Sequence, residues 1–288
     1  MLTLLFDGIA YGMLLFVLAV GLAVTMGLMN FVNLAHGAFA MAGGYLLVLL
    51  TQRWGWPFVA CLPVAFVVTA ALGAALERTL YRPMYAKPHL DQVLFSIGLT
   101  FMAVAAVDWF MGSSMQIVQL PEFLRGRSEF FGGALGVGHY RLFIVVVCVA
   151  LTFGLQAILM RTRFGSRLRA AVDDPRVAGG LGIPVNRVFL ATFAAGSGLA
   201  GLGGALGAEV LGMDPTFPLK FMVYFLIVVA VGGTSSITGP LLAALLLGIA
   251  DVFGKYYVPK LGAFVVYLLM IALLLYRPQG LFARERGR

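Results

Sequence analysis

Apolar residues fall in long runs along this chain, and short polar or glycine-rich stretches separate them. Most runs are long enough to cross a bilayer as an α-helix, which takes roughly 20 residues. The runs do not alternate polar and apolar residues at every second position, as membrane-spanning strands do. The pattern predicts helices at 8–28, 36–51, 57–80, 93–111, 141–160, 188–206, 219–232, 239–253 and 261–276.

The seventh and eighth runs, 219–232 and 239–253, are shorter than the others. Short runs predict broken or re-entrant segments, so we expect about eight to ten transmembrane helices. A weak internal similarity points the same way. NLAHGAFAMAGGYLLVLL at 33–50 and SSITGPLLAALLLGIADV at 235–252 each place a polar, glycine-bearing turn before a short apolar helix. Interrupted segments in two halves of a chain indicate a transport path.

The composition is typical of a membrane protein and excludes a water-soluble globule. Of the 288 residues, 61% are hydrophobic and 11% are charged, and the mean hydropathy is +0.98. A soluble domain is about half apolar and about a quarter charged. The predicted fold class is therefore all-α, a polytopic integral membrane protein, with residues 1–288 in a single transmembrane domain.

Lysine and arginine are concentrated in 77–92, 161–187 and 277–288, which together hold most of the chain's 20 basic residues. Cytoplasmic loops carry such an excess. With nine spans, this distribution places the N-terminus outside and the C-terminus in the cytoplasm. Two loops are long. The outer one, 112–140, contains glycines and Pro121 and predicts a folded loop with a short hairpin, and 161–187 forms the inner one.

A short capped helix is predicted within the inner loop. Asp174 suits the N-cap, Pro175 the first helical position, and Gly182 the position after the C-cap. Three apolar side chains stand out on this polar loop: Val177, Leu181 and Ile183. Gly179 and Gly180 weaken the helix. Either a partner protein completes it, or it lies on the membrane surface beside the basic residues.

Reactive clusters are missing from the sequence. The histidines are far apart and fit no metal-binding spacing: His36, His89 and His139. The carboxylates closest to the spans all fall near predicted span ends, which gives no proton pathway: Glu77, Asp108, Glu209 and Asp251. We therefore predict that the chain is not an enzyme and has no catalytic residue, metal or bound cofactor.

Two glycine-containing stretches resemble nucleotide-binding motifs without the context that such motifs need. GSGLAG at 196–201 lies in an apolar run with no preceding strand, and it favours close packing of helices. GIADVFGKY at 248–256 has five residues between its glycines, where a phosphate-binding loop has four. It also has Tyr256 where that loop has Ser or Thr. If ATP drives this protein, a partner binds it.

The stretch NFVNLAHGAFAMAGGY at 30–45 places polar residues between two apolar runs. In one interpretation, Asn33 caps the second span near the headgroups, His36 lies in its first turn and the glycines allow close packing. In a second, four residues line or gate the transport path: Asn33, Ala35, His36 and Gly37. In a third, His36 takes part in metal or acid–base chemistry.

A second group of candidate path residues lies late in the chain: Tyr224, Thr234 and Ser235. The hydroxyl groups of 234–236 follow two glycines and precede Pro240. They either contact the substrate or cap the next short helix. Both interpretations remain open from the sequence.

Four motifs, in order along the chain, resemble the H-type permease of bacterial branched-chain amino acid ABC importers. NLAHGAFAMAGGYL after a GLAVTMGLMNFV span is similar to the family's signature. RAAVDDPRVAGGLGIPVNRVFLATFAAGSGLAGLGGALG is similar to its cytoplasmic coupling loop and the following span. VGGTSSITGPLLAALLLG resembles its glycine-rich late turn, and YRPQGLFAR its C-terminus. The resemblance covers about residues 8–284.

The resemblance implies a permease subunit in the bacterial inner membrane that moves branched-chain or other hydrophobic amino acids. The implied partners are a second, M-type permease, two ATPase subunits that hold ATP and magnesium, and a periplasmic substrate-binding protein docking on 112–140. We expect a largely apolar path with few charges. The alternatives are a permease for urea, a short amide, or an aromatic or other carboxylate, and a self-sufficient channel or carrier.

The resemblance also makes the short helix 175–181 a coupling helix seated in an ATPase subunit. The residues implied in docking are Asp174, Pro175, Arg176, Val177, Ala178, Leu181, Gly182 and Ile183. The chain departs from the family's pattern at Arg176, because the family usually has a glutamate followed by alanines there. The docking role therefore carries over to this helix, but the family's ion pairs do not.

Overall fold

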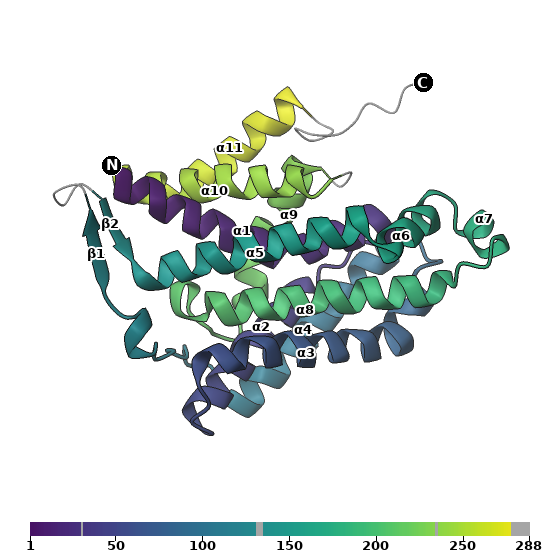
Figure 1. The fold of residues 1–288 in the computed structure, drawn as a ribbon, viewed down its shortest axis with the longest axis horizontal. Coiled ribbons are helices and arrows are strands. Elements are labelled where there is room, and N and C mark those ends of the chain that lie inside the picture. The colour runs from purple at the N-terminus through teal and green to yellow at the C-terminus, as the bar shows by residue number, and fades with distance from the viewer. Residues whose placement is uncertain (30, 131–134, 234–235, 278–288) are drawn as a thin grey trace.

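The structure, a computed structural model, describes residues 1–29, 31–130, 135–233 and 236–277. These residues are almost entirely helical (Figure 1). The helices are α1 (Leu2–Met29), α2 (His36–Gln52), α3 (Phe58–Leu76), α4 (His89–Met111), α5 (His139–Arg161), α6 (Arg163–Asp173), α7 (Pro175–Gly180), α8 (Val185–Leu211), α9 (Phe217–Gly232), α10 (Thr238–Tyr257) and α11 (Gly262–Tyr276). The predicted all-α polytopic fold is confirmed.

Nine helices within the described residues occupy the nine predicted runs. Six are long and apolar enough to cross a membrane: α1, α3 with its extension to Met84, α4, α5, α8 and α10. The others are shorter, with 17 residues in α2, 16 in α9 and 15 in α11. The prediction of a short segment at 239–253 was wrong, because α10 continues to Tyr257 and has 20 residues.

The centre of the bundle is built around α1 and α8. Both helices are largely buried, whereas α4 and α5 turn most of their apolar surface outward. Large apolar side chains such as Trp109, Phe110 and Phe153 are exposed on these outer helices. A soluble protein would not leave so much apolar surface uncovered. The chain is therefore a multi-pass membrane protein.

Glycines bring the central helices into backbone contact. A Cβ atom added at Gly204 of α8 would lie 1.8 Å from the carbonyl oxygen of Ala40 in α2. One added at Gly43 would lie 2.0 Å from the carbonyl oxygen of Gly201. Only glycine allows this separation between α2 and α8. The packing role predicted for the GSGLAG stretch of α8 is therefore confirmed.

The contacts between helices divide the bundle into two similar halves, α1–α2–α3 and α8–α9–α10. The long first helix of each half packs along the third helix of the other, so α1 lies on α10 and α8 on α3. The short second helix in each half contacts its own third helix. Figure 1 shows that α1 and α8 run in opposite directions, as in an inverted repeat. This arrangement relates α2 to α9, so the similarity of 33–50 to 235–252 does not mark equivalent segments.

The two ends of the bundle carry different loops (Figure 1). At one end, here called the hairpin end, the start of α1 meets the antiparallel strands β1 (Arg127–Phe130) and β2 (Leu135–Gly138), and Gly136 N–H donates to Thr3 Oγ1 at 3.0 Å. The hairpin predicted within 112–140 is confirmed. At the other end, here called the α7 end, the 77–84 extension of α3 lies beside α7 and the start of α8.

Candidate functional site

The chain between α1 and α2 enters the bundle as a non-helical segment and reaches its middle. His36, the first residue of α2, places its Nε2 atom 2.8 Å from the carbonyl oxygen of Leu18. Leu18 lies near the middle of the 28-residue helix α1. The helix break therefore lies beside the middle of α1. This position is deeper in the bundle than the one near the headgroups that the first interpretation gave it.

Side chains of α4 satisfy the backbone of this segment. The N–H of Val32 donates to Gln92 Oε1 at 3.2 Å, and that of Leu34 donates to Ser96 Oγ at 3.2 Å. The Thr100 hydroxyl lies 3.5 Å from the carbonyl oxygen of Leu34. Non-helical backbone is stable at this depth only where protein or water completes its hydrogen bonds. These three polar residues of α4 provide that completion.

Asn33 organises the turn that leads into α2. Its Oδ1 accepts from the N–H of Ala35 at 3.1 Å and from the hydroxyl of Tyr81 at 3.1 Å. Helix α2 itself begins after Ala35, which makes no side-chain cap. Asn33 therefore closes an Asx-type turn and ties it to the extension of α3. It does not cap α2 directly.

His36 joins three helices. Besides the contact with α1, its ring meets Phe225 of α9 edge-on, with 6.2 Å between centroids. Next to it, Gly37 packs against Pro218 at the start of α9. The four predicted path residues of this stretch, Asn33, Ala35, His36 and Gly37, are all buried against protein. Among the described residues, no group of three His, Cys, Asp or Glu side chains is arranged to hold a metal ion.

Tyr224 lies apart from these residues. Its hydroxyl donates to Asp251 Oδ1 at 3.2 Å, and Lys255 Nζ reaches Asp251 Oδ2 at 2.6 Å. Thr234 and Ser235 lie outside the described residues. The Ser236 Oγ accepts from Gly239 N–H at 3.3 Å, as the helix-capping interpretation predicted for this hydroxyl.

Two carboxylates are more deeply buried than the sequence predicted. Asp251 is only 2% exposed in α10, because that helix extends past the predicted span. Glu77 is 2% exposed where α3 continues as a π-helical turn, and it accepts from the Tyr85 hydroxyl at 3.2 Å. Burial, together with the neighbouring Glu77 carboxylate, raises the pKa of Tyr85, so that its hydroxyl keeps its proton.

The predicted short helix in the inner loop is present as α7. Asp174 Oδ1 accepts from the N–H groups of Arg176 and Val177 at 2.8 and 3.0 Å. Gly182 has φ +81° and donates to Gly179, and Ile183 N–H donates to the Ala178 carbonyl at 3.0 Å. Such a pair closes a helix C-terminus. Cap chemistry thus fixes both ends of α7, as predicted.

The loop also contains α6, which the sequence analysis missed. Leu168 and Ala171 of α6 pack with Val188 of α8 in a small separate core. Ile183 joins this core, whereas Val177 and Leu181 are 58% and 77% exposed. The amphipathic spacing of α6 was the available signal, with polar residues between its apolar ones. This small core attaches α6 and Ile183 to α8, and the side chains of Val177 and Leu181 remain exposed.

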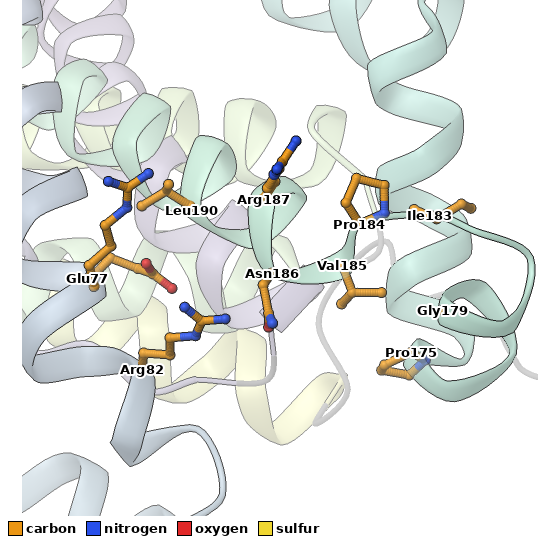
Figure 2. A pocket seen from close by; sticks show the side chains of 11 residues that line it. Glu77, Arg82, Pro175, Gly179, Ile183, Pro184, Val185, Asn186, Arg187 and Leu190 are labelled. Carbon is orange, nitrogen blue, oxygen red and sulfur yellow. The ribbon is translucent and has the colours of Figure 1, made fainter.

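A groove of about 660 Å³ runs beside α7 at this end (Figure 2). Figure 2 shows Glu77 and Arg82 on one wall, Pro175 and Gly179 on another, and Arg187 between them at the start of α8. Arg78 also lines the groove. Three arginines against one carboxylate make it basic. Such a groove is suited to an acidic segment of a partner protein.

Comparison with known proteins gives consistent matches over nearly the whole chain. A family model described as "Branched-chain amino acid transport system / permease component" matches residues 4–274. The high-affinity branched-chain amino acid transport system permease protein BraD of Pseudomonas aeruginosa is 29% identical over 97% of this chain and 95% of its own length. LivH of Escherichia coli is 28% identical over 97% of this chain and 94% of its own length. LivM of Salmonella typhimurium, which is also named as a permease protein of a high-affinity branched-chain amino acid transport system, is 28% identical. The match covers 95% of this chain and 69% of LivM. No solved structure matches significantly.

Proposed function

Because the chain belongs to the family of branched-chain amino acid transport system permease components, we propose that it is the membrane-spanning permease subunit of an ATP-driven importer. Its substrates are branched-chain or other hydrophobic amino acids, as the names of its relatives suggest. The chain itself performs no covalent chemistry. Other small solutes are the alternative substrates that a transport assay would reveal.

The observation that carries this proposal is the exposed, capped helix α7. Val177 and Leu181 are apolar and exposed, next to Asp174 and Gly182, which fix the helix ends. The basic groove lies along the same helix, at Pro175 and Gly179. Exposing these apolar side chains to water is unfavourable, and a partner protein that covers them removes this cost. We assign docking of an ATPase subunit to α7 and the groove, through residues Asp174, Pro175, Arg176, Val177, Ala178, Leu181, Gly182 and Ile183.

The polarity of the proposed contact differs from that expected of the family. Arg176 adds a positive charge to a region that already contains Arg78, Arg82 and Arg187. We therefore propose that the matching ATPase surface is acidic.

The remaining partners follow from the same proposal. A second permease of the M-type completes the membrane part, in keeping with relatives of both types. Two ATPase subunits bind ATP and magnesium, and a periplasmic binding protein docks on the 112–140 loop. The chain resides in the bacterial inner membrane, with the N-terminus periplasmic and the C-terminus cytoplasmic. The hairpin end then faces the periplasm, and the α7 end the cytoplasm.

We further propose that the central break gates the path. The buried residues Asn33, Ala35, His36 and Gly37 connect α1, α2 and α9 at mid-depth, where a small shift of a short helix opens or closes a route. Thr234 and Ser235 remain candidate path residues. Tyr224 belongs with Asp251 near the hairpin end.

Co-purification tests the docking proposal. The tagged chain is expressed with the ATPase and second permease subunits and pulled down in mild detergent, as wild type and as Val177→Asp/Leu181→Asp. We expect the ATPase to accompany the wild type and to be lost from the double variant. The matched control is Ile117→Asp/Phe123→Asp, which changes exposed apolar residues in the 112–140 loop and should retain the ATPase. Equal retention by both variants would contradict docking at α7.

A further inference from the structure

A cleft with charged walls opens at the hairpin end and continues into the bundle. Its outer part, about 490 Å³, lies between the hairpin and the ends of α1, α5 and α8. Its inner part, about 220 Å³, continues between α1, α5 and α10. Both parts are lined by Asp7, Arg141 and Val210, so they adjoin at these residues. None of the residues assigned to the gate or to ATPase docking lines it.

Two carboxylates and two cations face the inner part of this cleft. Asp7 of α1 pairs with Arg141 of α5, and Asp251 pairs with Lys255 one turn later in α10. The carboxylates are buried, with side chains 16% and 2% exposed, whereas the cations are about half exposed. Ionisable groups are energetically unfavourable inside a membrane bundle. Those that are present therefore commonly mark a functional site. The equal numbers of each charge make the inner part neutral overall, whereas Glu209, Arg125 and Arg127 line only the outer part.

One of these groups has unused hydrogen-bonding capacity. Both carboxylate oxygens of Asp251 accept hydrogen bonds, Oδ1 from the Tyr224 hydroxyl and Oδ2 from Lys255 Nζ. Asp7 uses only Oδ2 for Arg141, and its Oδ1 is buried with no partner among the described residues. Leaving a buried carboxylate oxygen without a donor is unfavourable. A ligand with an N–H donor would complete it when the Asp7 side chain turns Oδ1 toward the cleft.

The floor of the cleft is apolar. Ala10 and Leu14 of α1, Ile144 of α5 and Val252 of α10 line it below the charged groups. Ala10, Leu14 and Ile144 are themselves buried. The cleft therefore combines paired charges near its mouth with an aliphatic surface further in. A ligand that fits both must have an ionic head and a hydrocarbon tail.

We propose that this cleft binds a zwitterionic α-amino acid with an aliphatic side chain. The α-ammonium group donates to Asp7, the α-carboxylate accepts from Arg141, and the side chain lies on Val210 and Val252, the partly exposed apolar residues of the inner part. A neutral zwitterion matches a site whose own charges cancel, whereas a simple anion or cation leaves one member of the ion pair without a partner. The inference rests on the proposed function and adds to it a substrate site with charged groups, whereas the sequence predicted a largely apolar path with few charges.

A phosphatidylethanolamine headgroup carries a similar pair of charges and is the other source of such a ligand. The binding test therefore uses the assembled importer in phosphatidylcholine nanodiscs, whose headgroups have no ammonium N–H. Radiolabelled leucine is titrated without the binding protein. We expect saturable binding, competed by isoleucine but not by 4-methylpentanoate or 3-methylbutylamine, each of which lacks one charged group. No leucine binding, or phosphatidylethanolamine retained through purification, would overturn the proposal.

Variants locate the site. We expect Asp7→Asn and Arg141→Gln each to weaken leucine binding by about tenfold or more, since each removes a charged hydrogen bond. The control Asp108→Asn changes an exposed carboxylate near the end of α4 and should bind as the wild type does. The exchange Asp7→Arg/Arg141→Asp preserves the ion pair but reverses its order. It should assemble normally and still not bind. Wild-type binding by the exchanged or single variants would overturn the proposal.

ATP-driven leucine uptake with the binding protein separates this inference from the proposed function. If wild type imports leucine and both single variants do so at the same rate, the cleft is not the site, and the permease function stands. If the wild-type assembly neither contains an ATPase nor imports leucine, the proposed function itself fails.

Discussion

His36 connects three helices at the centre of the molecule through one ring. The imidazole contacts the Leu18 carbonyl oxygen of α1 and the Phe225 ring of α9 while it begins α2. Among the described residues, His36 belongs to no group of His, Cys, Asp or Glu side chains that could hold a metal ion. Its contacts show a structural role, on which the gating proposal builds.

Loss of this ring should destabilise the bundle. His36→Ala removes a buried hydrogen bond and leaves a cavity, with an expected loss of about 1–3 kcal/mol. That corresponds to a fall in melting temperature of several degrees, about 2–4 °C per kcal/mol. Thermal unfolding of the purified protein in detergent measures it. His89→Ala, at an exposed histidine, should melt as the wild type does, and an equal shift in both variants would contradict the account.

At the residue scale, the sequence predicted the helix caps correctly. It did not predict how deeply individual polar residues lie in the bundle. Asp174 and Gly182 were assigned correctly, because a cap depends on neighbours within one turn. His36 was noticed, but its depth depends on α4 side chains some 60 residues later, such as Gln92. Asp251 was misplaced at a span end. Its spacing from Lys255 at i and i+4 in a helix was the available signal.

At the scale of elements, α7 owes its shape to its two ends. With two glycines in six residues, it is weak apart from its caps. Asp174→Ala should remove about 1 kcal/mol of cap stabilisation and speed amide hydrogen exchange in 175–181 several-fold. The matched control is Asp173→Ala, which changes the neighbouring carboxylate without a cap contact in the structure. Unchanged exchange in Asp174→Ala would show that the cap is not what holds the helix.

The contact between α2 and α8 depends on backbone proximity. Gly204→Ala would put a Cβ atom against the Ala40 carbonyl, so we expect a loss of about 3 kcal/mol or more, or no folded protein. Gly98→Ala in α4 has nothing within 4 Å and should be tolerated. Fluorescence-detected size-exclusion chromatography and thermal unfolding compare the two. A well-folded Gly204→Ala protein would contradict this packing.

At the scale of the whole molecule, the sequence predicted the number and order of the apolar helices because length and hydropathy determine them. It missed the pairing of the halves, in which α1 lies on α10 and α8 on α3. That pairing depends on contacts between distant glycines, such as Gly12 with α10. Of the segments rich in basic residues, 77–92 and 161–187 nevertheless lie together at the α7 end.

The proposed orientation can be tested with single cysteines. The native residues Cys61 and Cys148 are buried and give little background. A membrane-impermeant maleimide should label Glu129→Cys, in the hairpin, in cells with a permeabilised outer membrane. It should label Leu181→Cys, in the segment following α7, only after the inner membrane is opened. The reverse pattern would invert the topology and exclude the assigned docking surface from the cytoplasm.

The most direct test of the central claim is leucine uptake by the reconstituted importer. Proteoliposomes contain this chain with its second permease and ATPase subunits, with ATP inside and the binding protein with leucine outside. The account predicts uptake that requires both ATP and the ATPase, and that falls by about tenfold or more in Val177→Asp/Leu181→Asp. Uptake by this chain alone without ATP, unchanged in the double variant, would contradict it and identify a self-sufficient carrier.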